Sequence, residues 1–227
     1  MLGLSPSDGR IVLSFPKEDG NKLTSASIEY LCLNPAVHLN RIMDQVNKLL
    51  LTSGTLEPAG EFALLKSKDA GDGDGSPWRF NCGHVVGKAN FKALCVGSTF
   101  DFRYEHRNNQ SQLRKLALFT ENVIRLQQKT LGGGSVLFLQ SYAYQRTFKS
   151  FVEDHSDQCP LLSDINFTFW ESQTTKNIFE SYSRRINKER KGAALICVIG
   201  GKLSEGINFS DDLARTVMVA GLPYPST

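Results

Sequence analysis

The sequence predicts an α/β fold in which a parallel sheet is built from strands joined by crossover helices. Short β-rich segments alternate with longer segments of helical periodicity through the second half of the 227-residue chain. The strand predicted at residues 193–199 is apolar at every position, as expected for a strand covered on both faces. Gly200 and Gly201 follow it directly, at the sheet edge where parallel sheets hold ligands.

The composition is that of an ordinary globular protein. Hydrophobic residues make up 41% and charged residues 22%, and the net charge of +3 does not require a polyanionic partner. No window approaches the roughly 18 consecutive apolar residues of a membrane span, so no membrane role is expected. The first residues carry no secretory signal pattern.

The five cysteines form no Cys-x-x-Cys pair, which is typical of a reducing compartment. Three of them lie in apolar runs and are predicted to be small core residues: Cys32, Cys95 and Cys197. Neither the cysteines nor the four histidines show the spacing of metal ligands, and no metal site is expected in this chain.

The elements of the first 66 residues combine strands with two helices. A helix is predicted to begin at Asn34, whose side chain can cap it, followed by Pro35 in the first turn. The predicted elements are strands at residues 10–15, 27–33 and 48–51, the last one buried, and helices at 34–47 and 57–66.

Residues 67–77 separate this part from the rest. They alternate Asp with Gly and are too polar to pack, so a flexible loop is predicted. A calcium-binding loop is the weaker reading, because the closing glutamate of such loops is absent.

Residues 78–227 carry the alternating pattern. A long helix at residues 108–130 has one apolar face and is stopped by Gly132, Gly133 and Gly134. The predicted strands are residues 78–82, 91–96, 135–139, 167–170, 193–199 and 216–220, and two further helices are predicted at 141–155 and 174–189.

Three predicted strand ends carry hydroxyl groups. They are Thr52 and Ser53, then Ser141 with Tyr142, and Ser204 in the loop that also holds Lys202. A helix cap alone explains any one of them, but three at the same kind of junction indicate an edge that bonds phosphate oxygens or stacks on bases. Basic residues also cluster at 184–191, either as a solvated helix end or as part of a charged binding surface.

The Gly-Lys pair at 201–202 is not a phosphate-binding loop of the Walker A type. That motif requires Ser or Thr after the lysine, and here Leu203 follows. A strand-to-helix turn whose glycines serve only chain reversal therefore stays possible for residues 200–209 taken alone.

Taken together, residues 51–56, 135–142 and 200–209 resemble helicase motifs III, IV and V of the XPD-like iron-sulfur DNA helicases of superfamily 2. Residues 8–14, 33–38, 82–86 and 204–211 resemble in particular the branch that serves sister-chromatid cohesion. The resemblance runs from about residue 8 to residue 226. It implies a RecA-like sheet, with residues 1–66 the end of a first RecA-like domain, 67–77 a loop, and 78–227 a second RecA-like domain.

The same resemblance assigns roles to particular residues. At Asn208 many members carry aspartate, and the amide keeps the hydrogen bonding but loses the charge. The resemblance implies that four residues face the nucleotide cleft: Ser204, Glu205, Gly206 and Asn208. It implies that five others contact DNA or couple DNA binding to the nucleotide state: Thr52, Ser53, Ser141, Tyr142 and Lys202.

The implied activity is that of an ATP-dependent DNA helicase, which binds ATP and Mg²⁺, moves along single-stranded DNA and unwinds a duplex or fork. It implies a nuclear protein with cohesion and replication proteins as partners, and a 4Fe–4S cluster in an amino-terminal part outside this chain. The 227 residues contain no Walker A lysine, DEAH-type site or motif VI, so no catalytic residue is expected here and the chain alone should be inactive. The alternative is a non-catalytic nucleic-acid-binding or partner-binding module with a helicase fold.

Overall fold

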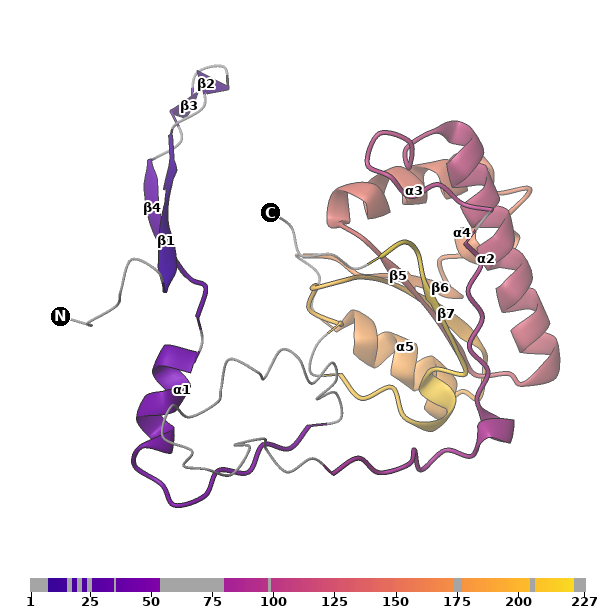
Figure 1. The fold of residues 1–227 in the computed structure, drawn as a ribbon. Helices are drawn as coiled ribbons and strands as arrows, with labels where there is room; N and C mark the ends of the chain where they lie inside the picture. Colours follow the sequence, from indigo (N-terminus) through magenta and orange to yellow (C-terminus); the bar gives the residue numbers. More distant parts are fainter. Residues whose placement is uncertain are drawn as a thin grey trace. The chain divides into compact units, whose positions relative to one another are not determined.

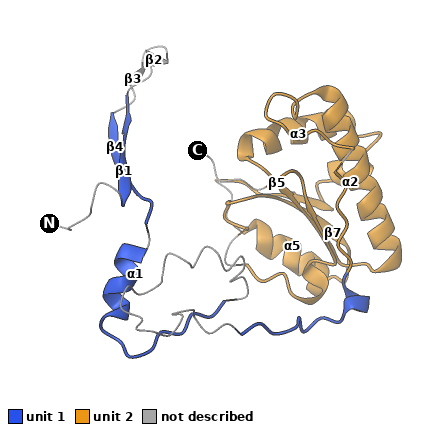
Figure 2. Cartoon of the chain, viewed as in Figure 1, with its two compact units in different colours: residues 1–91 blue, residues 92–227 orange. Residues whose placement is uncertain are grey.

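The chain divides into two compact units, residues 1–91 and 92–227 (Figure 2). The structure, a computed structural model, describes residues 8–15, 18–19, 22–23, 26–34, 36–53, 80–97, 99–173, 177–204 and 207–222. The predicted helix at 57–66 and the predicted loop at 67–77 lie outside these residues.

The first unit contains an antiparallel ladder followed by a short helix. Strand β1 (Gly9–Ser14) pairs with β4 (Ser27–Cys32), from Gly9 opposite Cys32 to Ser14 opposite Ser27. A two-residue ladder of β2 (Glu18–Asp19) and β3 (Lys22–Leu23) lies between them in the chain (Figure 1). The predicted pair of strands is therefore confirmed.

Helix α1 (Ala36–Met43) begins where the sequence places a cap. Asn34 Oδ1 accepts a hydrogen bond from Ala36 N at 3.1 Å, and Asn34 Nδ2 donates one to Asp8 Oδ1 at 3.0 Å. The side chain of Asn34 thus ties the start of the helix to the start of the ladder.

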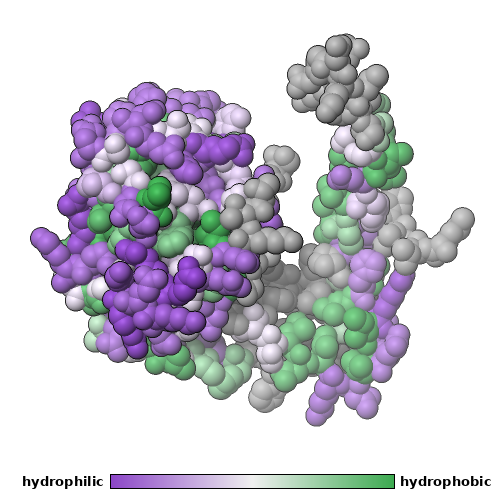
Figure 3. All heavy atoms as spheres, turned by 180° about the vertical axis from the view of Figure 1, so that it is seen from behind, coloured by the Kyte–Doolittle hydropathy of each residue, from purple (hydrophilic) through white to green (hydrophobic). Residues whose placement is uncertain are grey.

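Apolar residues of the first unit, and those at residues 92–96 where the second unit begins, are largely exposed, and four predictions are wrong. Residues 48–51 form no strand, and Leu50 is 84% exposed. Residues 80–82 and 91–96 form no strand either, and Cys32 and Cys95 are exposed rather than core residues. A two-stranded ladder has no second layer to cover its faces, so hydrophobic side chains show on the surface of this unit in Figure 3.

The second unit is an α/β sandwich around a four-stranded parallel sheet of order β6-β7-β5-β8 (Figure 1). The confirmed α/β fold thus has crossover helices on both faces of the sheet. Its elements are α2 (Gln110–Thr130), β5 (Gly134–Leu139), α3 (Tyr142–Asp154), α4 (Pro160–Ser163), β6 (Thr168–Trp170), α5 (Ile178–Asn187), β7 (Ala193–Val198), η3 (Asp211–Leu213) and β8 (Thr216–Val219), whereas the short helix η2 (Lys88–Asn90) lies at the end of the first unit.

Each face of the sheet has its own core. Leu137 and Ile196 point to the face covered by α2, α3 and α4, while Leu195 and Cys197 point to the face covered by α5 and η3. All six residues of β7 are buried, as the absence of polar alternation predicts. The central strands β5 and β7 therefore fix the position of everything that follows their carboxyl ends.

The ends of α2 follow the predicted signals. Asn109 Oδ1 accepts a hydrogen bond from Ser111 N at 2.9 Å at its start, and Gly132 and Gly133 take positive φ values of 64° and 76° after its end. Among the helices within the described ranges, none offers an apolar stretch of the length a bilayer crossing requires.

Candidate functional site

Three chain segments meet at the carboxyl edge of the parallel sheet. They are residues 140–142 after β5, residues 171–173 after β6, and residues 199–204 after β7. Because β7 lies between β5 and β6, its loop is flanked by the other two segments. This is the edge at which open α/β sheets hold ligands.

Glu171 is the centre of this edge. Its side chain is 4% exposed, and Oε1 accepts hydrogen bonds from Tyr142 Oη at 2.8 Å and from Leu203 N at 3.2 Å. Oε2 accepts from Val198 N at 2.8 Å. Burying a carboxylate is costly unless donors surround it, and here three donors from two other strand ends do so. Glu171 therefore joins all three segments into one unit.

Tyr142 is held in its protonated form by the same contact. Burial, then the hydrogen bond to Glu171 and the negative charge of its carboxylate, raise the pKa of the Tyr142 hydroxyl. Near neutral pH the phenol therefore acts as a donor to Glu171, and its ring stays fixed at the start of α3.

The two glycines after β7 serve different purposes. Gly200 has a φ of 70°, which a residue with a side chain adopts only with strain. At Gly201 a Cβ atom would lie 2.6 Å from Glu171 Oε1 and 2.8 Å from Tyr142 Oη. The paired glycines therefore let the loop turn and then pass close to the Glu171 carboxylate.

Lys202 and Ser204 complete the loop. Lys202 is exposed, and its Nζ donates a hydrogen bond to Gln173 O at 2.7 Å, which ties the loop to the segment after β6. Ser204 Oγ donates to Gly201 O at 2.9 Å and closes a turn. The ammonium group of Lys202 has two further protons to offer an anion at this edge.

Ser141 is the N-cap of α3. Its Oγ accepts a hydrogen bond from Tyr144 N at 3.2 Å, so the capping explanation holds for this residue. Its neighbour Gln140 accepts a hydrogen bond at Oε1 from Arg107 Nη1 at 2.7 Å. Both residues that follow β5, Gln140 and Ser141, are therefore held by side-chain hydrogen bonds.

The structure brings Ser141, Tyr142, Lys202 and Ser204 to this one edge. Asn208 is exposed and precedes Phe209, whose ring packs edge-on against Phe138 and Phe179. Glu205 and Gly206 lie outside the described residues. Thr52 and Ser53 are exposed residues of the first unit, and their coupling role stays a prediction.

Glu171 and Arg107 were not predicted as site residues from the sequence. The signal for Glu171 was available, because it follows the predicted strand at residues 167–170 in the same way that Ser141 follows the strand before it. Arg107 follows an aromatic stretch and precedes a predicted helix, a position that carried no signal on its own.

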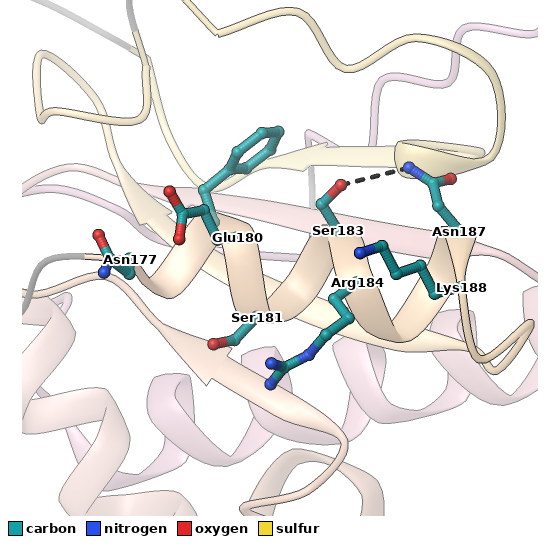
Figure 4. Close-up of a pocket in the computed structure, with 8 residues that line it drawn as sticks. Asn177, Glu180, Ser181, Ser183, Arg184, Asn187 and Lys188 are labelled. Atoms are coloured by element: carbon teal, nitrogen blue, oxygen red, sulfur yellow. Dashed lines mark hydrogen bonds between the residues drawn. The ribbon is translucent and has the colours of Figure 1, made fainter.

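The basic cluster at residues 184–191 lies at the opposite edge of the sheet. Arg184 and Lys188 line a depression that runs along the length of α5, in which Asn187 Nδ2 donates to Ser183 Oγ at 3.2 Å (Figure 4). Arg185 Nε donates to Gly192 O at 2.8 Å and stabilises the turn into β7. Because this turn leads into the amino end of β7, the cluster is a helix end distant from the Glu171 edge.

Metal ligands do not gather at either edge. Within the ranges that the structure describes, no group of three or more His, Cys, Asp or Glu side chains could hold a metal ion.

The sheet order, the helices on both faces and the polar strand ends at one edge define the class: this unit is a RecA-like helicase C-terminal domain. Residues 124–227 match the family model described as "Helicase C-terminal domain". The fold class predicted from the sequence is confirmed.

Similar proteins narrow this class to one branch. The chain is 35% identical over 215 residues to the ATP-dependent DNA helicase CHL1 of Candida albicans, covering 91% of this chain and 24% of the relative. It is 33% identical to the ATP-dependent DNA helicase chl-1 of Caenorhabditis elegans, over 96% of this chain and 26% of that relative. It is 31% identical to the ATP-dependent DNA helicase DDX11 of Mus musculus, over 99% of this chain and 25% of that relative. The chain belongs to this CHL1 and DDX11 family of helicases, and it spans about a quarter of the length of these relatives.

Proposed function

We propose that this chain is part of an ATP-dependent DNA helicase that moves along single-stranded DNA and unwinds a duplex or fork. The observation that supports the proposal best is the joining of Tyr142, Glu171 and the Lys202 loop at one sheet edge, in a chain of this helicase family. The edge offers a cation, hydroxyl groups and a rigid support beneath them. These are the groups that contact phosphates without reading base sequence.

Within this function, the loop after β7 senses the nucleotide and the start of α3 contacts DNA. Ser204, Glu205, Gly206 and Asn208 face the nucleotide, and Ser141, Tyr142 and Lys202 face the DNA backbone. Because Glu171 Oε1 accepts from both Tyr142 and Leu203, a displacement of the loop changes the position of Tyr142 directly. The carboxylate thus couples nucleotide state to grip on the strand.

The remaining parts of the motor follow the family resemblance. Residues 1–66 complete a first RecA-like domain in which Thr52 and Ser53 take part in coupling, residues 67–77 are a connecting loop, and residues 78–227 are the second domain. Mg²⁺ and a 4Fe–4S cluster are bound by other residues of a complete helicase, so this chain supplies contacts to ATP but no metal ligand.

The cellular location that we propose follows from the DNA substrate. A helicase that acts on chromosomal DNA in a eukaryote works in the nucleus, and the relatives come from eukaryotes. Cohesion and replication proteins are the partner classes that fit this role.

Measuring ATP turnover in the presence of single-stranded DNA tests the proposal. We expect no turnover above background for these 227 residues, because they contain no Walker A lysine. A longer product of the same locus should hydrolyse ATP when single-stranded DNA is added. Robust turnover by the 227 residues alone, or none by the longer product, would contradict the proposal.

A further inference from the structure

We propose that Tyr104 and Arg107 form an additional contact for single-stranded nucleic acid, in which the Tyr104 ring stacks on a base and the Arg107 guanidinium binds a backbone phosphate. The inference rests on the proposed function and assigns it two residues outside the helicase motifs recognised in the sequence.

Arg107 lies at the same sheet edge as Tyr142 and Glu171. Its Nη1 donates to Oε1 of Gln140, the residue that directly follows β5, at 2.7 Å. Gln140 in turn packs against Gly221, which follows β8 with a φ of 83° and has no room for a Cβ atom beside the Gln140 amide. The ends of two neighbouring strands therefore fix Arg107, and a cation held in advance binds an anion with less loss of side-chain entropy.

Two tyrosine rings flank the guanidinium. The Arg107 Cζ atom lies 4.7 Å from the centroid of the Tyr104 ring and 5.4 Å from that of the Tyr144 ring. Tyr144 is 2% exposed and belongs to the core, whereas Tyr104 is 76% exposed. Tyr104 thus presents ring surface to solvent while Arg107 supports it, which is the arrangement of a stacking platform.

The polar atoms of this group are not all used. Arg107 Nε and the buried Tyr144 Oη have no hydrogen-bond partner among the described residues. A guanidinium has five N–H donors, so Arg107 can keep its bond to Gln140 and still donate to an anion.

The charges around the group also suit an anion. Asp101, the carboxylate on the preceding turn, pairs with Arg103 at 2.6 Å and with His106 at 2.7 Å. No carboxylate forms an ion pair with Arg107 in the described part of the chain. The cation is therefore open to a phosphate.

Base stacking and phosphate binding together select a nucleic acid strand over an acidic peptide. Every base has a face that stacks on an aromatic ring, so the contact does not depend on sequence, which suits a protein that moves along a strand. An acidic peptide would use Arg107 but gain nothing from Tyr104.

Fluorescence anisotropy with a labelled oligothymidylate tests this inference. Tyr104→Ala should weaken binding roughly tenfold, the effect of losing one stacked base, while Tyr104→Phe keeps the ring and should bind normally. Arg107→Ala should weaken binding and lower the salt dependence by about one counterion, while Arg107→Lys should keep the salt dependence.

An abasic oligonucleotide separates the two contacts. On it, Tyr104→Ala should bind as well as the unsubstituted chain, whereas Arg107→Ala should still be weaker. Because Tyr104 is largely exposed, its substitution should leave thermal unfolding unchanged, so a loss of binding is not a loss of fold.

The outcomes distinguish this inference from the proposed function. If the unsubstituted chain binds the oligonucleotide and Tyr104→Ala binds equally well, the inference is wrong and the proposed function stands. Competition by polyglutamate as strong as competition by oligothymidylate would also overturn it. If the unsubstituted chain shows no binding at low salt, both the inference and the DNA-binding role of this edge are wrong.

Discussion

Tyr142 donates a 2.8 Å hydrogen bond to Glu171 and thereby links the end of β5 to the end of β6, two strands that are not neighbours in the sheet. The strand between them, β7, ends in the loop that the same carboxylate holds through Leu203 N. One acidic side chain, Glu171, therefore holds the three strand ends together, and the stability of this edge of the sheet should depend on it.

Replacing Glu171 by Gln should destabilise the second unit by about 1–3 kcal/mol, because the new amide group faces a donor where the carboxylate offered an acceptor. Glu171→Ala should cost more, since it leaves Val198 N and Tyr142 Oη without their acceptor. The measurement is urea unfolding followed by circular dichroism.

The matched control is Glu153→Gln on α3. Its carboxylate is 60% exposed and lies 3.7 Å from Lys149 Nζ, so the loss of this surface pair should change stability by less than about 1 kcal/mol. Equal unfolding midpoints for Glu171→Gln and the unsubstituted chain would show that the buried carboxylate does not brace the edge.

The sequence predicted the elements whose signal is local or periodic. Helix α2 has a cap, an apolar face and a glycine stop, and β7 has six apolar residues without alternation, so both were found within a few residues. Tyr142 and Lys202, which the resemblance of three motifs names as contacts to DNA, lie at one edge of one sheet, and their role stays a prediction.

What the sequence could not supply were relations between distant residues. Residues 91–96 have the same β-rich composition as a true strand, but a strand needs a neighbour to pair with, and none lies beside them in the described chain. Glu171 reads as an ordinary charged residue until the fold surrounds it with donors. Cys32 and Cys95 stand in apolar runs that no second layer covers.

Gly201→Ala should disturb the same edge through sterics. The added Cβ would meet Glu171 Oε1 at 2.6 Å and Tyr142 Oη at 2.8 Å, and buried oxygens held by hydrogen bonds cannot withdraw freely. We expect a loss of about 1–3 kcal/mol in the free energy of unfolding.

Gly97→Ala is the control for this substitution. A Cβ at Gly97 would meet nothing within 4 Å, so stability should stay the same or rise slightly as the unfolded chain loses freedom. A Gly201→Ala variant as stable as Gly97→Ala would mean that the loop does not approach Glu171 closely in solution.

Lys202→Ala should weaken binding of single-stranded DNA and reduce its salt dependence by about one counterion. The lysine is exposed at the proposed binding edge, where it is tied to Gln173 O. Titrations of a labelled oligonucleotide at several salt concentrations provide the measurement.

Arg184→Ala removes the same charge from the last turn of α5, near the opposite edge of the sheet, and serves as the control. It should bind DNA nearly as well as the unsubstituted chain. Equal weakening by both substitutions would indicate that net charge alone, rather than the Glu171 edge, governs binding.

Thiol labelling should separate the five cysteines into two classes. Cys32, Cys82 and Cys95 are exposed, whereas Cys159 and Cys197 are buried. Burial, with the charges of Glu121 and Asp157, raises the pKa of Cys159 to about 11, and burial raises the pKa of Cys197 further above its usual range. Since the thiolate is the reactive form, both buried thiols should resist alkylation in the folded protein.

We therefore expect three fast-reacting thiols near neutral pH and two more only after unfolding in urea, with mass spectrometry assigning the positions. Raising the pH sharpens the test. A thiol whose pKa is raised in the folded state keeps its proton to a higher pH there than in the unfolded state. The contribution of Cys159 to stability therefore falls as the pH rises from about 9, the ordinary pKa of the thiol, towards about 11. Cys159→Ala should reduce this loss of stability at alkaline pH. Rapid labelling of Cys159 at neutral pH in the folded chain would contradict its burial.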